Sequence, residues 1–237
     1  MVHVPTSLVA QVDSAYGGKT GVDLPEAKNY VGAFHQPAAV LVDPGLLSTL
    51  PAEELAAGFA EVVKTGLIAG EPLWPRVQAL GPLADEVGGD SLAQVIRGCA
   101  QTKLAIVSRD ERDRGERAAL NLGHTFAHAL EAAQNYTEIR HGEAVAVGLL
   151  VALGLSEARL GLDPSLRDDV KDLLERHGLP VTFSGPSTDE LLARAALDKK
   201  RRGGRHRMVL LERPGAVVTG VEVSDGELAA AIEEVRA

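Results

Sequence analysis

The hydrophobic pattern of this chain changes near residue 50, and that change constrains the fold more than any other feature. Before it, the segments that favour β-structure are short, at residues 2–4 and 39–42, and a loop rich in glycine and lysine lies between them. After it, apolar residues such as Leu55 and Phe59 recur at helical spacing. The sequence therefore predicts a mainly α-helical chain preceded by a short α/β segment.

The helical part has recognisable boundaries. Ser48 and Thr49 precede Pro51, and two glutamates follow in the first turn, which is typical of a helix start. Further helices are predicted at residues 91–108, 116–133, 142–160, 165–177, 188–197 and 225–236. Two β-favouring runs, at residues 208–211 and 217–223, flank Arg213-Pro214-Gly215 and predict a hairpin.

The first strand is too short to be stable without neighbouring strands. We therefore expect residues 1–50 to be the C-terminal remnant of an α/β domain, and residues 51–237 to form a separate helical domain. The usual dinucleotide-binding fingerprint G-x-G-x-x-G does not occur in the sequence.

Composition excludes several classes of protein. The formal net charge of −9 argues against a general binder of nucleic acid or of a membrane surface. The longest apolar run, residues 144–155, is shorter than the ~20 residues of a membrane helix and is typical of a buried core helix. Cys99 is the only cysteine, which excludes an intrachain disulfide and fits a reducing compartment. With no signal-peptide pattern at the N-terminus, these features predict a cytoplasmic protein.

One polar stripe is a candidate for chemistry. Arg117, Asn121, His124, His128 and Glu131 follow one another at spacings of 4, 3, 4 and 3, which would place all five on one face of a helix. A solvated polar face is the ordinary interpretation of such a stripe. Two histidines together with Arg and Asn, between apolar helices, favour an inward-facing site.

Spacing alone leaves the metal ligands open. His124 and His128, four residues apart, would be the obvious metal pair on a helix. Glu61 and Lys64 share another helix face, where the simplest account is an ion pair. His141 begins a further helix, where a capping or surface role is common. The pattern does not choose between these accounts.

A resemblance covers the whole chain. It is carried by eight motifs in order: Pro5-Thr6-Ser7-Leu8, Val12-Asp13-Ser14, Gly17-Gly18-Lys19-Thr20-Gly21, the segment from Lys28-Asn29 to Pro37, Ala60-Glu61-Val62-Val63-Lys64, Asn121-Leu122-Gly123-His124-Thr125, His141-Gly142-Glu143-Ala144-Val145 and Asp198-Lys199-Lys200. In this order they resemble the later two-thirds of the 3-dehydroquinate synthase family. The glycine-rich segment that grips the NAD pyrophosphate in that family would lie in the part with no counterpart here.

The resemblance implies a set of site residues. It assigns the metal ligands, for Zn²⁺ or Co²⁺, to Glu61, His124 and His141, a set that leaves coordination positions open for substrate oxygens. It assigns catalytic roles to Asp13, Lys64, Lys103 and His128. It assigns substrate binding to Lys19, Asn29, Arg117, Asn121, Lys199 and Lys200. It assigns NAD contacts to Thr6, Ser7, Lys19, Lys28, Leu46, Leu47, Ser48 and Thr49.

The implied activity is that of an NAD- and metal-dependent lyase of the shikimate pathway, which leads to chorismate and the aromatic amino acids. It converts 3-deoxy-D-arabino-heptulosonate 7-phosphate to 3-dehydroquinate and phosphate. NAD oxidises a ring hydroxyl transiently, phosphate leaves, and the cofactor then returns the hydride. The partner is a small sugar phosphate, and a homodimer is expected. Three alternatives stay open: a sister sugar-phosphate cyclase of secondary metabolism, a metal-dependent alcohol or glycerol-phosphate dehydrogenase, and a non-catalytic fragment.

Overall fold

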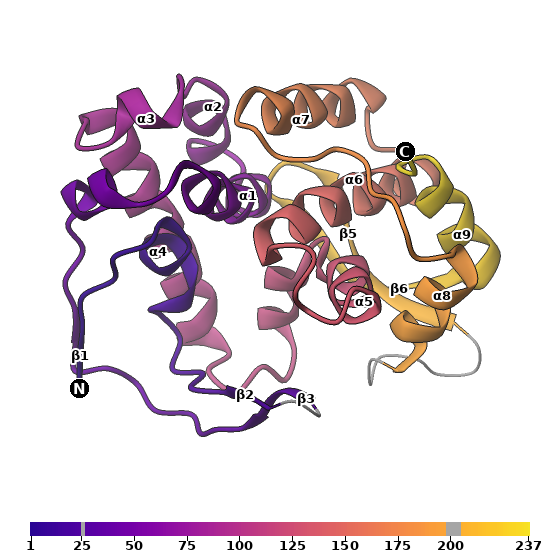
Figure 1. The fold of residues 1–237 in the computed structure, drawn as a ribbon, viewed down its shortest axis with the longest axis horizontal. Coiled ribbons are helices and arrows are strands. Elements are labelled where there is room, and N and C mark those ends of the chain that lie inside the picture. Colours follow the sequence, from indigo (N-terminus) through magenta and orange to yellow (C-terminus); the bar gives the residue numbers. More distant parts are fainter. Residues whose placement is uncertain (25–26, 198–204) are drawn as a thin grey trace.

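The computed structural model describes residues 1–24, 27–197 and 205–237 (Figure 1). Its α-helices are α1 (Ala52–Ala69), α2 (Leu73–Gln78), α3 (Leu83–Glu86), α4 (Asp90–Arg109), α5 (His124–Ala133), α6 (His141–Leu160), α7 (Pro164–Arg176), α8 (Thr188–Leu197) and α9 (Asp225–Glu233). Shorter helical turns are η1 (Ala10–Ser14), η2 (Pro44–Thr49) and η3 (Glu116–Asn121). The strands are β1 (Val2–His3), β2 (Val22–Leu24), β3 (Ala27–Val31), β4 (Ala39–Val40), β5 (Arg205–Arg213) and β6 (Ala216–Ser224). The expected mainly α fold is confirmed.

Helix α6 is the centre of the fold. Residues 144–153 of this helix are buried on every side, as the long apolar run predicted. Helices α1, α5, α7 and α9 and strand β5 all pack against it, so Figure 1 shows it surrounded by other elements. A helix that is apolar all round needs such complete coverage.

The first fifty residues pack onto the helices and share their core. Strand β1 pairs with β4 in parallel, with Val2 opposite Ala39, and β2 pairs with β3 as an antiparallel hairpin. Leu8 and Val12 belong to the same hydrophobic cluster as the buried residues of α1. A side chain on Gly58 of α1 would come within 2.7 Å of the Leu8 Cβ, so the two segments are in close contact.

Most of the predicted helices are confirmed, but the helix predicted over residues 116–133 is wrong. The structure has η3 and then α5, separated at Leu122 and Gly123. Gly123 has a φ of 78°, which breaks the helix, and its Cα lies against the backbone of Leu149 in α6. The stripe from Arg117 to Glu131 is therefore not one helix face. Helices α2 and α3 and the hairpin β2–β3 were not predicted.

The predicted start of α1 is confirmed in position, although its capping is different. Ser48 and Thr49 lie in η2, and Pro51 is the residue at the N-cap, with no capping hydrogen bond from a side chain. The predicted hairpin is confirmed as β5 and β6, which turn at Pro214-Gly215. The Leu211 amide of β5 donates to Ser156 Oγ of α6 at 2.9 Å, which fixes the hairpin on the central helix. Among the helices of the described residues, none has the length and apolarity to cross a membrane.

Candidate metal centre

Three side chains from separate helices meet at one point. Glu61 comes from α1, His124 begins α5 and His141 begins α6. Glu61 Oε1 lies 3.3 Å from His124 Nε2 and 3.2 Å from His141 Nε2. One potential ligand atom from each residue lies within 4.8 Å of the other two. The convergence that the resemblance implied is therefore present in the fold.

Close contacts between helix backbones hold these three residues together. A Cβ on Gly142, next to His141, would overlap the carbonyl of Ala57, one turn before Glu61 in α1. A Cβ on Gly148 would likewise overlap the carbonyl of Gly123, next to His124. Glycine at these two positions lets α6 approach both of its neighbours closely. The ligand geometry is thus built into the helix packing.

The two oxygens of Glu61 face different partners. While Oε1 faces the imidazoles, Oε2 forms an ion pair with Lys64, and both side chains are about 1–2% exposed. Burial alone would raise the pKa of Glu61, but the Lys64 ammonium and the His124 ring outweigh it and hold that pKa well below its usual range. The pKa of Lys64 is raised, because the Glu61 and Asp13 carboxylates outweigh its burial. The Glu61–Lys64 pair and the metal hypothesis are therefore compatible.

Both histidines are oriented through their second ring nitrogen. Nδ1 of His124 lies 3.1 Å from the Leu122 carbonyl, and Nδ1 of His141 lies 3.3 Å from Glu131 Oε1. Burial opposes protonation of His141, but the Glu131 and Glu61 carboxylates raise its pKa to about 9. Without an ion the ring is thus held protonated between two carboxylates. A divalent cation would replace one proton there.

One carboxylate and two imidazoles suit a catalytic zinc site. Such sites bind the ion through three protein groups and leave the remaining position for water or substrate. Both Nε2 atoms already face the same carboxylate oxygen, and the Glu61 side chain is 1% exposed. The donor set and its burial therefore fit a zinc or cobalt ion.

A second ion pair lies beside this centre and joins the buried Lys103 to the half-buried Asp13. Lys103 of α4 donates to the Asp13 backbone carbonyl at 2.7 Å and to Asp13 Oδ1 at the same distance. Burial would raise the pKa of Asp13, but the Lys64 and Lys103 ammonium groups lower it below its ordinary value. Burial lowers the pKa of Lys103, which Asp13 only partly offsets. A lysine with a lowered pKa is a candidate for proton transfer.

Two cations each link the glycine-rich loop with the segment after α4. Arg117 is 3% exposed; its Nη1 donates to the Glu111 carbonyl at 2.7 Å, and its guanidinium lies against Gly17. Lys19 forms an ion pair with Asp113 at 2.5 Å. Asn121 ends η3 and is half-buried. We expect a cleft shared by Arg117, Asn121, Lys19 and His124, and this stays a prediction.

The remaining expected site residues differ in how far the structure describes them. His128 is exposed, with its ring centroid 5.4 Å from that of His124 and 6.4 Å from that of His141. Lys28 and Asn29 lie in β3, but their side chains are outside the described part. Lys199 and Lys200 also lie outside the described residues.

Apart from Lys19 and Lys28, the positions expected to touch NAD lie on two segments that Gln11 joins. Thr6 and Ser7 follow β1, and residues 46–49 lie in η2. The buried Gln11 amide donates to the carbonyls of Pro5 and Asp43, one beside each segment. The side chain of Leu47 is in the hydrophobic core, so only its backbone could face a ligand.

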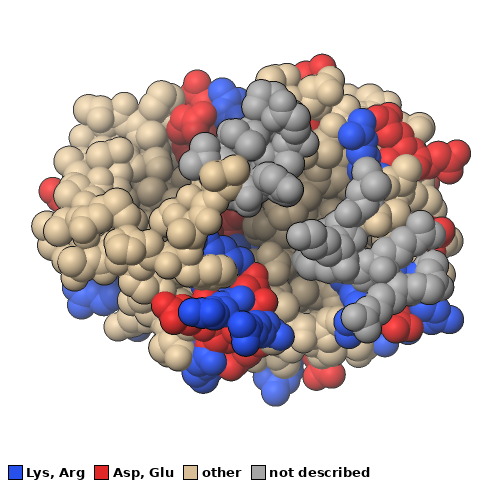
Figure 2. Space-filling view, turned by 90° about the horizontal axis from the view of Figure 1, so that it is seen from below, with Lys and Arg blue, Asp and Glu red and all other residues tan. Residues whose placement is uncertain are grey.

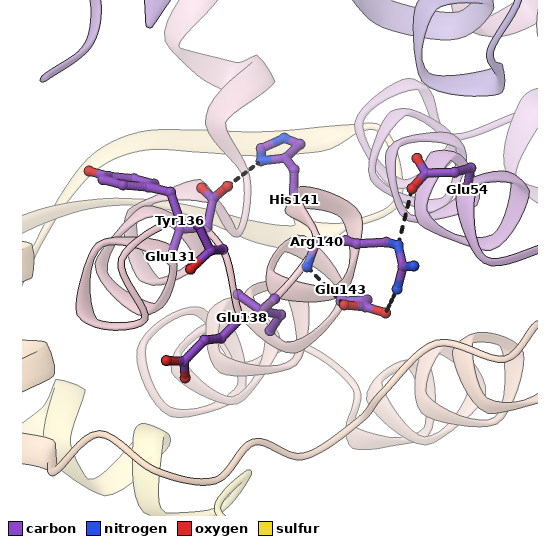
Figure 3. Close-up of a pocket in the computed structure, with 9 residues that line it drawn as sticks. Glu54, Glu131, Tyr136, Glu138, Arg140, His141 and Glu143 are labelled. Carbon is purple, nitrogen blue, oxygen red and sulfur yellow. Dashed lines mark hydrogen bonds and ion pairs between the residues drawn. The ribbon is translucent and has the colours of Figure 1, made fainter. Parts of the chain in front are cut away.

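A pocket of about 480 Å³ opens beside the metal centre (Figure 3). Its wall carries the side chains of His141 and Glu131, which face one another, and the ion pairs of Arg140 with Glu54 and Glu143. On the face drawn in Figure 2 the charge is mixed, with blue and red side chains next to one another at the edge of a hollow.

Sequence reasoning missed three contacts of this site. It gave no role to Gln11 or to Asp113, and it placed Glu131 on a polar stripe without a partner. The sequence did carry a signal for Glu131: it follows His124 by seven residues, or two helical turns, and so lies on the same helix face as that candidate ligand. Nothing in local spacing connects Gln11 with Asp43 or Lys19 with Asp113.

Comparison with known sequences identifies relatives of the whole chain. A sequence model of the 3-dehydroquinate synthase C-terminal domain matches residues 58–201, and one of the N-terminal domain matches residues 1–57. The 3-dehydroquinate synthase of Azotobacter vinelandii is 47% identical over 92% of this chain. That of Pseudomonas fluorescens is 48% identical over 92% of it. The chain spans about 60% of the length of each of these relatives.

Solved structures share the fold. The 2-epi-5-epi-valiolone synthase of Streptomyces hygroscopicus, solved with NAD⁺ and Zn²⁺ bound, matches 99% of this chain and 65% of its own, with a TM-score of 0.89 and 30% identity. A 2-deoxy-scyllo-inosose synthase, solved with carbaglucose-6-phosphate, NAD⁺ and Co²⁺, matches 99% of this chain and 66% of its own, with a TM-score of 0.84 and 26% identity.

Proposed function

The chain belongs to the 3-dehydroquinate synthase family, and from this premise we propose that it forms the metal- and substrate-binding part of such an enzyme. In this proposal residues 1–50 belong to the α/β NAD-binding domain, and residues 51–237 are the helical domain. The observation that carries it is the convergence of Glu61, His124 and His141 on one point within the fold.

The metal hypothesis assigns a task to each neighbouring side chain. Glu61, His124 and His141 hold Zn²⁺ or Co²⁺, which supplies polarisation of substrate oxygens. The Lys64 ammonium, paired with Glu61 Oε2, fixes the carboxylate so that Oε1 faces the histidines. Asp13 and Lys103 form an ion pair in which a proton can be held or moved beside the reacting hydroxyls, and exposed His128 is an acid or base at the edge.

An anionic substrate needs cations fixed in place. Arg117, with its planar fork of donors, and Lys19 are proposed to bind the phosphate and carboxylate, together with Asn29, Asn121, Lys199 and Lys200. In the structure Lys19 is held by Asp113, and a substrate anion would take that carboxylate's place. NAD is proposed to contact the segments of Thr6, Ser7, Lys19, Lys28 and residues 46–49.

The proposed reaction is elimination of phosphate from 3-deoxy-D-arabino-heptulosonate 7-phosphate and closure of the ring to 3-dehydroquinate. The substrate assignment is supported by 44–48% identity to bacterial 3-dehydroquinate synthases, against 26–30% to the solved sister cyclases. A phosphate-release assay with NAD⁺ and Zn²⁺ should favour this acid over glucose 6-phosphate. Preference for the neutral sugar phosphate would assign the chain to a sister cyclase, and net consumption of NAD⁺ to a dehydrogenase.

Metal binding is the direct test. Calorimetric titration of the chain with Zn²⁺ should show one ion bound per chain, and the Glu61→Ala variant should lose it while its far-UV circular dichroism is unchanged. Glu53→Ala is the matched control, since Glu53 is an exposed carboxylate on the same helix. Stoichiometric zinc at wild-type affinity in Glu61→Ala would exclude Glu61 as a ligand.

The family resemblance also supports a cytoplasmic location and a homodimer. A buried, single Cys99 suits a reducing compartment. Light scattering coupled to size-exclusion chromatography would measure the mass in solution. A mass of one chain at micromolar concentration would refute the dimer.

A further inference from the structure

A buried carboxylate lies behind His141, on the side away from the other ligands. Glu131 is 2% exposed, and its Oε1 is 3.3 Å from Nδ1 of His141. The other ring nitrogen, Nε2, is 3.2 Å from Glu61 Oε1. The imidazole therefore has a carboxylate at each ring nitrogen, Glu131 at Nδ1 and Glu61 at Nε2. Figure 3 shows the first of these contacts, between His141 and Glu131.

We propose that Glu131 is a positioning residue of the metal centre, which accepts the Nδ1–H of His141 and so directs its Nε2 lone pair to the ion. This inference rests on the proposed metal function. A carboxylate in this place fixes the tautomer and the ring orientation and makes the imidazole a stronger electron donor. Removal of such partners weakens metal binding by about 10- to 100-fold in well-studied sites.

The surroundings of His124 differ from those of His141, which supports a specific role for Glu131 at His141. Nδ1 of His124 faces the neutral carbonyl of Leu122, within its own chain segment. His141 instead has a charged acceptor from a different helix, α5. His141 is also the more exposed of the two rings, at 39% against 10%. It is therefore the ring that packing holds less tightly and that most needs a partner to fix it.

A second explanation, in which Glu131 only joins α5 to α6, fits the structure less well than a role at the metal centre. Those helices already meet through the Gly123–Gly148 contact and through apolar side chains such as Ala127 and Leu130. Burial of an ionised carboxylate is unfavourable unless it is paired and hydrogen-bonded. If His141 is a metal ligand, its need for a strong hydrogen-bond acceptor explains why the charged Glu131 is buried at this position.

The test compares Zn²⁺ affinity in Glu131→Gln, Glu131→Ala and the wild type by competition with a chromophoric chelator. Glu131→Gln has nearly the same shape and keeps an acceptor but loses the charge, so we expect about tenfold weaker binding. Glu131→Ala loses the acceptor, so we expect a loss nearer 100-fold. The matched control is Glu138→Gln, an exposed carboxylate on the same pocket wall. It should bind Zn²⁺ as the wild type does.

The Co²⁺-loaded protein gives a second measurement that a structural role would not change. Its visible absorption reports the geometry of the ion, and we expect the bands to shift in both Glu131 variants but not in Glu138→Gln. If Glu131→Ala fails to fold, Glu131→Gln decides the matter. Wild-type affinity and an unchanged Co²⁺ spectrum in Glu131→Gln would overturn the positioning role, and failure of the wild type to bind Zn²⁺ would overturn the proposed metal function with it.

Discussion

The contact between Gly142 and Ala57 allows a specific prediction about the candidate metal centre. In Gly142→Ala a new methyl group would overlap the Ala57 carbonyl, which is backbone and cannot rotate away. An ordinary contact of 3.4 Å would require α6 to move from α1 by about 1 Å or more. Metal–ligand distances tolerate shifts of only about 0.2 Å. We therefore expect Zn²⁺ affinity to fall by at least about tenfold, since His141 and Glu61 would separate.

Stability and a control substitution complete this test. Alanine is favoured over glycine in a helix by about 1 kcal/mol, whereas overpacking against backbone costs up to about 3 kcal/mol, so urea unfolding should show a net destabilisation of up to about 2 kcal/mol. Gly154→Ala is the matched control in the same helix, because its new methyl would meet only the flexible Arg167 side chain. If Gly142→Ala binds Zn²⁺ and unfolds as Gly154→Ala does, the close approach does not set the ligand geometry.

Four further outcomes are expected. Arg117→Lys should lower the free energy of unfolding by about 1–3 kcal/mol, because lysine cannot both donate to Glu111 and fill the space beside Gly17; a urea midpoint equal to the wild type's would contradict this. His177 is buried against Phe59 at a ring-centroid distance of 4.1 Å, and burial lowers its pKa. As pH falls, His177 is therefore protonated in the unfolded chain before it is protonated in the folded chain. The free energy of unfolding should decrease below about pH 6.5, and this decrease should be smaller in His177→Phe. Because the pKa of His141 is about 9 without metal, Zn²⁺ binding at pH 7 should release a proton. Calorimetry in buffers of different ionisation enthalpy would detect the proton, and its release should disappear above about pH 9. The same raised pKa adds stability to the metal-free protein that is complete below about pH 6.5 and lost as pH rises through about 9.

The sequence predicted the helices better than the junctions between them. Apolar periodicity placed α4, α6 and α7 within a residue or two of their observed ends. It failed between residues 116 and 133, because the left-handed Gly123 is set by contact with Leu149, far along the chain. No local pattern contains such a contact.

The candidate metal ligands show the same limit. Spacing offered His124 with His128 as one pair on a single helix but did not decide between that pair and other accounts, and only the family motifs selected Glu61 and His141 as ligands with His124. The structure brings all three ligands together through tertiary packing of α1, α5 and α6. Periodicity within one helix does not encode which other helix lies opposite. The Glu61–Lys64 pair, in contrast, was visible from spacing and is present.

The pair formed by Asp13 and Lys103 limits how this chain can be recombined with its relatives. Asp13 lies in the segment matched by the N-terminal family model and Lys103 in the segment matched by the C-terminal one. A chimaera whose N-terminal segment lacks this carboxylate would keep the hydrogen bond from Lys103 to the backbone carbonyl at position 13 but would leave the buried ammonium without its counter-charge. A recombined chain should therefore be most stable when one parent supplies the carboxylate and the other the lysine.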